Sequence, residues 1–189
     1  MQNEKIHPSA KIHPTAIIYD DVIINENVSI GPFCVIGGPV ELSGVFQDGK
    51  GLIIESGTRI ENACIIQSGF NGLITKIGKN CIIMSNAYIG GNATLNDDVV
   101  LCPFAKIGQF VWLGKGVFVG INSLVFTQNV GHYCRISSQS FLVGGEAVPS
   151  GGVYQGNPAI YIGKNEINGT KFGLKDQDFN DLQKTEKFN

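Results

Sequence analysis

The sequence predicts an all-β protein whose short strands wind into a three-sided parallel coil, on the evidence of composition, glycine content and a six-residue repeat. Isoleucine and valine far outnumber leucine and alanine, and β-branched side chains suit pleated, packed surfaces better than helices. The 25 glycines among 189 residues supply turns with positive φ. Hydrophobic residues make up 43% and charged residues 16%, which is too apolar a balance for a disordered chain.

An aliphatic residue recurs every six positions from Ile6 to Leu142, with two interruptions and one residue dropped before Val130. A small or β-branched residue stands four places after each of these leading residues. Six fits neither a helical nor an alternating period unless each hexad is a short strand that ends at a corner. Three hexads form one coil, and stacked coils bury the leading side chains. The pattern therefore predicts a left-handed parallel β-helix of about seven to eight coils.

The repeat also predicts the domain organisation. A β-helix domain is expected over residues 1–159, with loops near 43–51 and 68–76, followed by a C-terminal extension over 160–189. The loops carry function or merely absorb insertions, and the sequence leaves both readings open. In the extension, residues 176–186 begin with an Asp cap and form either one short helix or a frayed tail.

Charge, hydropathy and metal-ligand content argue against several classes of protein. A net charge of −2 without a basic arm argues against nucleic-acid binding by bulk charge. No apolar run approaches the roughly 18 residues of a membrane span, and the first five residues lack the apolar core of a signal peptide, so we expect a cytoplasmic protein. We expect no metal site, because two of the three histidines, His7 and His13, fall on successive sides of the coil. Most of the five cysteines occupy fourth places of hexads, where a small buried side chain is wanted.

Several segments carry a resemblance to a known family. They are Ile12–Ile17, Ile30–Gly37, Gly72–Gly78, Ile83–Ile89, Val143–Gly145 and Gln155–Ala159. Together they resemble UDP-N-acetylglucosamine O-acyltransferase, the first enzyme of lipid A synthesis. The resemblance implies a homotrimer with an active site between subunits and a nucleotide-sugar substrate. It also implies an acyl carrier protein or CoA thioester as donor and co-substrate, and no tightly bound cofactor.

The sequence departs from the family at the position of the base. There the family has a histidine followed by an acidic residue, two places after the lead of a central hexad. Here Gly91 and Asn92 occupy those places, and Tyr88 takes a position that is commonly histidine. Gln67 opens a run where the family tends to have His-Arg-Gly-Thr. Gln67, Asn86, Tyr88 and Gly91 are the candidate substrate-binding residues.

Two residues are candidates for catalysis. His132 stands at the same place within its hexad as the missing histidine, on a later coil and a different side, and is either a base or a surface imidazole. Asn92 either orients a substrate through its amide or occupies a corner that needs left-handed φ.

The donor site is predicted at the end of the repeats. In related acetyltransferases the segment that matches Gln155, Gly156 and Asn157 lies beside CoA, or beside the uridine when the donor is an acyl carrier protein. Lys171 is a candidate for pairing with phosphate. These three residues and Lys171 are therefore the candidate cofactor-binding residues.

Three functions stay open. The first is an acyltransferase that moves an acyl group from a thioester to a nucleotide-linked sugar, in lipid A or surface-glycan synthesis. The second is an acetyl-CoA-dependent amino-sugar N-acetyltransferase, because an amine with a pKa near 8 needs no strong base while a hydroxyl does. The third is a catalytically silent β-helix that binds a ligand or builds an assembly.

Overall fold

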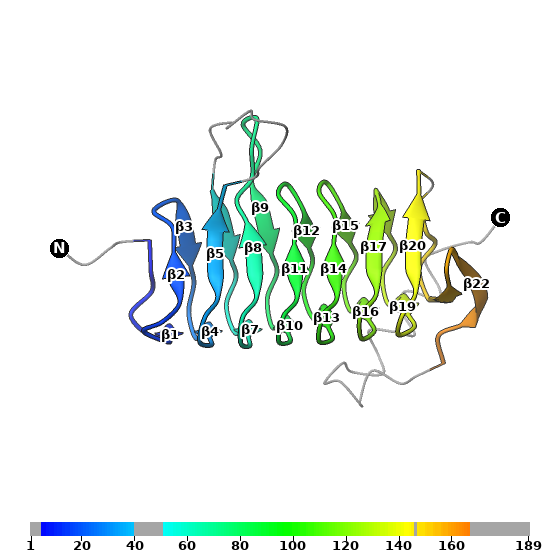
Figure 1. The fold of residues 1–189 in the computed structure, drawn as a ribbon, viewed down its shortest axis with the longest axis horizontal. Coiled ribbons are helices and arrows are strands. Elements are labelled where there is room, and N and C mark those ends of the chain that lie inside the picture. Colours follow the sequence, from blue (N-terminus) through cyan, green and yellow to red (C-terminus); the bar gives the residue numbers. More distant parts are fainter. Residues whose placement is uncertain (1–4, 40–50, 146, 167–189) are drawn as a thin grey trace.

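The computed structural model describes residues 5–39, 51–145 and 147–166, and within them the chain forms a left-handed parallel β-helix. Short strands wind around a three-sided prism whose coils stack along its long axis (Figure 1). Each side is one sheet, parallel except where β22 joins β21, and the strands from β1 to β20 fall on successive sides in chain order. The predicted fold is confirmed. No helix in the described part of the chain is long and apolar enough to cross a membrane.

The strands form a nine-stranded, a seven-stranded and a six-stranded sheet within the described ranges. The nine-stranded sheet contains β1 (Lys11–Ile12), β4 (Ser29–Ile30), β7 (Arg59–Ile60), β10 (Ile82–Ile83), β13 (Val100–Leu101), β16 (Phe118–Val119), β19 (Arg135–Ile136), β21 (Gly152–Gly156) and β22 (Ala159–Lys164). The seven-stranded sheet contains β2 (Ile17–Ile18), β5 (Val35–Gly38), β8 (Ile65–Gln67), β11 (Tyr88–Ile89), β14 (Lys106–Ile107), β17 (Leu124–Thr127) and β20 (Phe141–Gly144). The six-stranded sheet contains β3 (Val22–Ile24), β6 (Leu52–Ile54), β9 (Thr75–Ile77), β12 (Thr94–Leu95), β15 (Trp112–Leu113) and β18 (Asn129–Val130).

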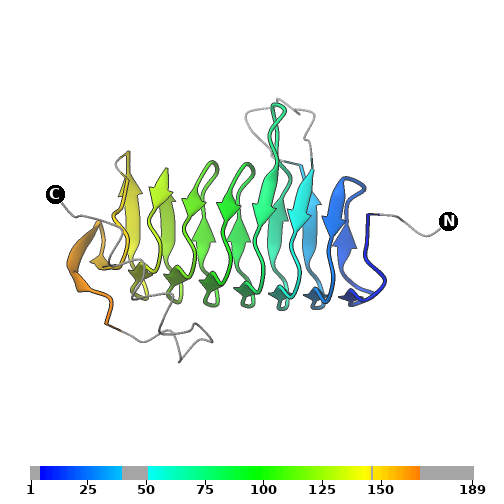
Figure 2. The ribbon, with the colours of Figure 1, turned by 180° about the vertical axis from the view of Figure 1, so that it is seen from behind.

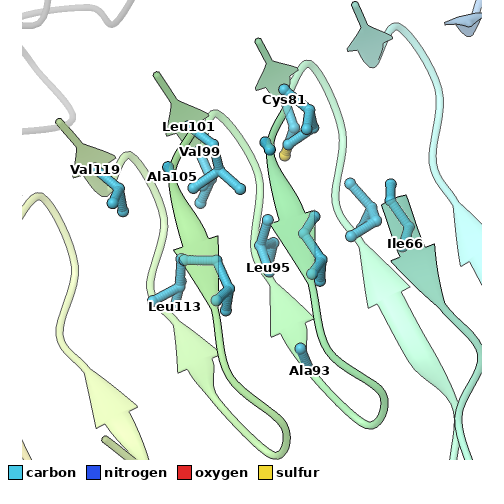
Figure 3. Packing of buried hydrophobic residues seen from close by; sticks show 14 of the residues in the cluster. Ile66, Cys81, Ala93, Leu95, Val99, Leu101, Ala105, Leu113 and Val119 are labelled. Atoms are coloured by element: carbon cyan, nitrogen blue, oxygen red, sulfur yellow. The ribbon is translucent and has the colours of Figure 1, made fainter. Parts of the chain in front are cut away.

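The core of the prism is the column of leading residues together with their fourth-place partners. Ile83, for example, lies between Ile60 and Leu101 on neighbouring strands and is fully buried. Figure 3 shows leading residues such as Leu95 beside small fourth-place residues such as Ala93. Alternation of large and small side chains fills the narrow interior without voids.

All five cysteines are free and buried, as the repeat predicts for four of them. Burial raises the pKa of the Cys81 thiol to about 12, so this thiol stays protonated near neutral pH. The expected structural role of these thiols agrees with this environment.

Each coil turns at three corners, which we name by the sheets they join. Corner I leads from the six-stranded to the nine-stranded sheet, corner II from the nine-stranded to the seven-stranded sheet, and corner III from the seven-stranded to the six-stranded sheet. Residues with left-handed φ occur at all three: Asn80 and Asp98 at corner I, Asn86 at corner II and Asn92 at corner III. The corner interpretation of Asn92 is confirmed by its φ of 61°.

Every interruption of the repeat falls at corner III. Strands β3, β6 and β9 stack in register, with Val22 paired to Leu52 and Leu52 to Thr75. The extra residues before β6 and before β9 therefore lie between the seven-stranded and six-stranded sheets. The second insertion, between β8 and β9, projects beyond the coils in Figures 1 and 2. The dropped residue lies there too, because Trp112 pairs with Asn129 whereas Lys106 pairs with Leu124.

The last described strand was not predicted. β22 turns back after a cis Asn157–Pro158 bond and pairs antiparallel with β21. The predicted loop at 43–51, apart from Gly51, and the predicted helix at 176–186 lie outside the described residues.

Candidate functional site

Four of the candidate site residues lie together at corner III and on the adjoining edge of the seven-stranded sheet. Gln67 ends β8, Tyr88 begins β11 on the next coil, and Gly91 and Asn92 form the corner that follows β11. The six-residue repeat causes this clustering, because residues one coil apart stack on the same side of the prism.

Gln67 is the centre of this cluster. Its Oε1 accepts hydrogen bonds from the Tyr88 hydroxyl at 2.8 Å and from the Gly91 N–H at 3.3 Å. Burial raises the pKa of the Tyr88 phenol, which therefore stays a neutral donor near pH 7. The side chains of this cluster are uncharged, and none of them takes up a proton near neutral pH.

Asn92 holds both ends of the second insertion. Its Oδ1 accepts a hydrogen bond from the Phe70 N–H at 2.8 Å, and its N–H donates to Thr75 Oγ1 at 2.9 Å. The Phe70 ring packs edge-on against Phe110, with centroids 5.2 Å apart. The Asn92 Nδ2 is buried and has no hydrogen-bond partner among the described residues. This amide is therefore an unsatisfied donor that is closed to solvent in this conformation.

Phe70, Thr75 and Phe110 were not predicted as site residues. Phe110 could have been found, since it stands one full coil after Asn92 and shares its left-handed φ. Phe70 and Thr75 flank an insertion, where the repeat gives no register from which to predict contacts.

The structure does not bring the other candidates to this cluster. Asn86 is exposed at corner II, six residues and therefore one corner before Asn92. Gln155 and Gly156 end β21 in the last coil, and Asn157 begins the turn to β22. Lys171 lies outside the described residues.

His132 lies at corner I, on a different side from Gly91, as the hexad count predicts. Its Nδ1 accepts a hydrogen bond from the Lys115 N–H at 2.9 Å, and its ring packs edge-on against Trp112 with centroids 5.5 Å apart. A neutral imidazole that accepts at Nδ1 carries its proton on Nε2, so it has no free lone pair to offer a substrate. Asp97 makes the equivalent contact two coils earlier, where its Oδ1 accepts from the Lys79 N–H at 2.8 Å. In this arrangement His132 is a corner acceptor; its role as a base stays a prediction.

Substitution of His132 separates these two roles. We expect His132→Ala to lower the free energy of unfolding by about 1–2 kcal/mol, because the Lys115 N–H loses its acceptor. His132→Asn retains an acceptor, as Asp97 does, and should lose less than half as much. Urea denaturation of both variants measures the effect. Equal losses in the two variants would contradict the corner role.

No group of three or more His, Cys, Asp or Glu side chains in the described ranges is arranged to hold a metal ion. The hydrogen-bonding groups of the cluster at corner III suit an organic ligand with neutral polar groups.

Fold and repeat define the class of protein to which this chain is similar. The family described as "Bacterial transferase hexapeptide (six repeats)" matches residues 5–38 and 74–109. Two solved structures of UDP-N-acetylglucosamine acyltransferases share the fold. The enzyme from Acinetobacter baumannii aligns with a TM-score of 0.69 and 23% identity over 96% of this chain and 82% of that chain. The enzyme from Bacteroides fragilis aligns with a TM-score of 0.70 and 17% identity over 97% of this chain and 84% of that chain.

Among curated proteins the chain resembles acyl-[acyl-carrier-protein]–UDP-N-acetylglucosamine O-acyltransferases. The protein from Agrobacterium fabrum is 25% identical over 96% of this chain and 59% of its own length. That from Paracoccus denitrificans is 34% identical over 26% of this chain and 19% of its own length. The chain thus spans less than two thirds of either relative.

Proposed function

We propose that this protein is an acyltransferase that moves an acyl group from a thioester to a nucleotide-linked sugar, in the cytoplasm and in lipid A or surface-glycan synthesis. The alignment of 96% of the chain with an acyl-carrier-protein-dependent O-acyltransferase supports the general reaction. The thioester is carried on acyl carrier protein or CoA, and no cofactor is tightly bound.

The acceptor in this proposal is an amine rather than a hydroxyl. The observation that carries this choice is the uncharged cluster around Gly91, where Gln67 Oε1 receives both hydrogen bonds and no side chain serves as a base. A sugar hydroxyl needs a positioned base, whereas an amine with a pKa of about 8 is partly neutral at pH 7. Loss of the histidine therefore lowers the rate of acyl transfer to a hydroxyl acceptor more than the rate of transfer to an amine.

The reaction then needs little from the protein beyond positioning. The amine nitrogen attacks the thioester carbonyl, a C–N bond forms, the C–S bond breaks, and the thiol leaves with the proton released from nitrogen through water. Asn92 is the proposed residue that orients the substrate; its Nδ2, buried without a partner in the described part of the chain, would reach a substrate oxygen once the side chain turns outward. Gln155, Gly156, Asn157 and Lys171 are the proposed donor-binding residues.

The seven-stranded sheet is the proposed contact face of a homotrimer. Its outer surface exposes large apolar side chains, and corner II beside it carries exposed Phe33 and Phe104. Both phenylalanines have left-handed φ, of 60° and 63°, which is costly for bulky residues. Contact with a neighbouring subunit would offset that cost. Tyr88 and Gln67 border the same face, so such a trimer would place the cluster beside a subunit contact.

The acceptor is tested by offering matched amino and hydroxyl forms of UDP- or dTDP-linked sugars with acyl-CoA or acyl carrier protein. We expect the amino form to react at least about 100-fold faster, because general-base catalysis typically contributes that factor to hydroxyl attack. Mass spectrometry of the product measures the difference. A better hydroxyl acceptor would refute the amine assignment. No thioester turnover with any acceptor would refute acyl transfer and favour the silent binding protein.

A further inference from the structure

A groove of about 550 Å³ crosses the nine-stranded sheet and corner II at the N-terminal end of the prism. It is lined by residues of the first three coils, among them Lys11, Ser29, Arg59 and Pro14. Corner III with its cluster lies on another edge of the prism. The groove is therefore not part of the proposed acyl-transfer site, and the inference drawn from it does not depend on that function.

Two cations face each other across a small hydroxyl side chain in this groove. Lys11 pairs in register with Ser29, and Ser29 with Arg59, so the three side chains form one outward-facing column. Adjacent strands lie about 4.8 Å apart, which puts the backbones of Lys11 and Arg59 about 10 Å apart. Both side chains are long enough to meet a single anion above Ser29.

The charges of both residues are available to a ligand. The Lys11 side chain is exposed and forms no ion pair or hydrogen bond within the described ranges. The Arg59 side chain is 57% exposed, and its Nη2 lies 3.8 Å from Glu61 Oε1, its one ion pair with a described residue. An exposed pair at that distance contributes little, so an anion can compete with the Glu61 carboxylate.

The rest of the groove is suited to an organic group. Exposed Pro14 provides an apolar surface beside the cationic column, and Asn62 adds a polar side chain to the lining. The groove is open to solvent, and its volume of about 550 Å³ is far larger than one phosphate. The groove thus offers two cations to a phosphate and an apolar surface to whatever the phosphate is attached to.

We propose that this groove binds an organic phosphate, with its phosphate between Lys11 and Arg59 above Ser29 and its organic part against Pro14. The arginine supplies planar, paired donors and the lysine a compact charge, a combination that suits phosphate oxygens. Phosphopantetheine and nucleoside diphosphates both present this chemistry.

The test is calorimetric titration of the full chain with inorganic phosphate, phosphopantetheine and UDP. We expect an organic phosphate to bind at least about tenfold more tightly than inorganic phosphate, since only it uses the apolar surface. Whichever of phosphopantetheine and UDP binds more tightly identifies the kind of organic phosphate that the groove takes. Binding of all three with equal affinity would overturn the proposal.

Charge-matched variants make the test specific. The double variant Lys11→Ala/Arg59→Ala should weaken organic-phosphate binding by at least about tenfold. Lys79→Ala/Lys115→Ala removes the same charge from corner I and should change affinity by less than about twofold. Glu61→Gln should strengthen binding, because it removes the competing carboxylate. Equal losses in the two double variants, or weaker binding by Glu61→Gln, would overturn the proposal.

Discussion

Replacement of Ile83 by alanine is expected to lower the free energy of unfolding by about 3–4 kcal/mol. Ile83 is fully buried in the middle of the leading-residue column, between Ile60 and Leu101. Removal of three carbons there costs the transfer free energy of the side chain and leaves a cavity, because the stacked coils cannot collapse around it. Urea denaturation followed by circular dichroism measures the change.

The neighbouring residue provides the control. Ile82 has the same side chain and lies in the same strand, but it points outward and is only half-buried. Ile82→Ala should therefore cost less than about 1 kcal/mol. Equal destabilisation by the two substitutions would contradict the assignment of Ile83 to the interior of the prism.

Substitution of Ile65 by aspartate is expected to dissociate the proposed trimer. Ile65 is 44% exposed on the outer surface of the seven-stranded sheet, the proposed contact face. A carboxylate buried without a partner in a subunit contact costs several kcal/mol, and a threefold symmetric assembly incurs this cost at each contact. Light scattering coupled to size-exclusion chromatography should show the mass of three 20.3 kDa chains for the wild type and of one chain for the variant.

Ile23 is the matched control, because it is 40% exposed on the six-stranded sheet. Ile23→Asp should leave the mass unchanged. A wild-type protein with the mass of one chain would refute the trimer outright. If Ile23→Asp dissociated the trimer and Ile65→Asp did not, the subunit contact would lie on the six-stranded sheet, against the proposal.

The fold could be predicted from the sequence because its periodicity is direct evidence of geometry. Within the described ranges, each leading residue of the six-residue repeat from Ile24 onward is buried, and the residue dropped before Val130 appears as a one-residue shift in strand register. The same count placed His132 on a different side from Gly91, whereas Asn86, grouped with Gly91 as a substrate-binding candidate, lies at another corner. Position in the repeat fixes the side of the prism, so these placements follow from arithmetic.

The contacts at irregular positions could not be predicted. The two hydrogen bonds by which Asn92 holds Phe70 and Thr75 depend on the path of an insertion, for which the repeat gives no register. The Nδ1 acceptor role of His132 depends on a side-chain rotamer at a corner. Strand β22 returns antiparallel after a turn, so it carries no six-residue signal.

The most direct test of the central claim, that acyl transfer at corner III proceeds without a histidine base, is the pH dependence of kcat/KM with an amino-sugar nucleotide. The amine is the nucleophile only when neutral, so the rate should rise with pH and level off above a pKa of about 8, that of the acceptor itself. The profile of His132→Ala should have the same midpoint. A profile with a further limb at lower pH that disappears in His132→Ala would show that His132 is the base and would contradict the account.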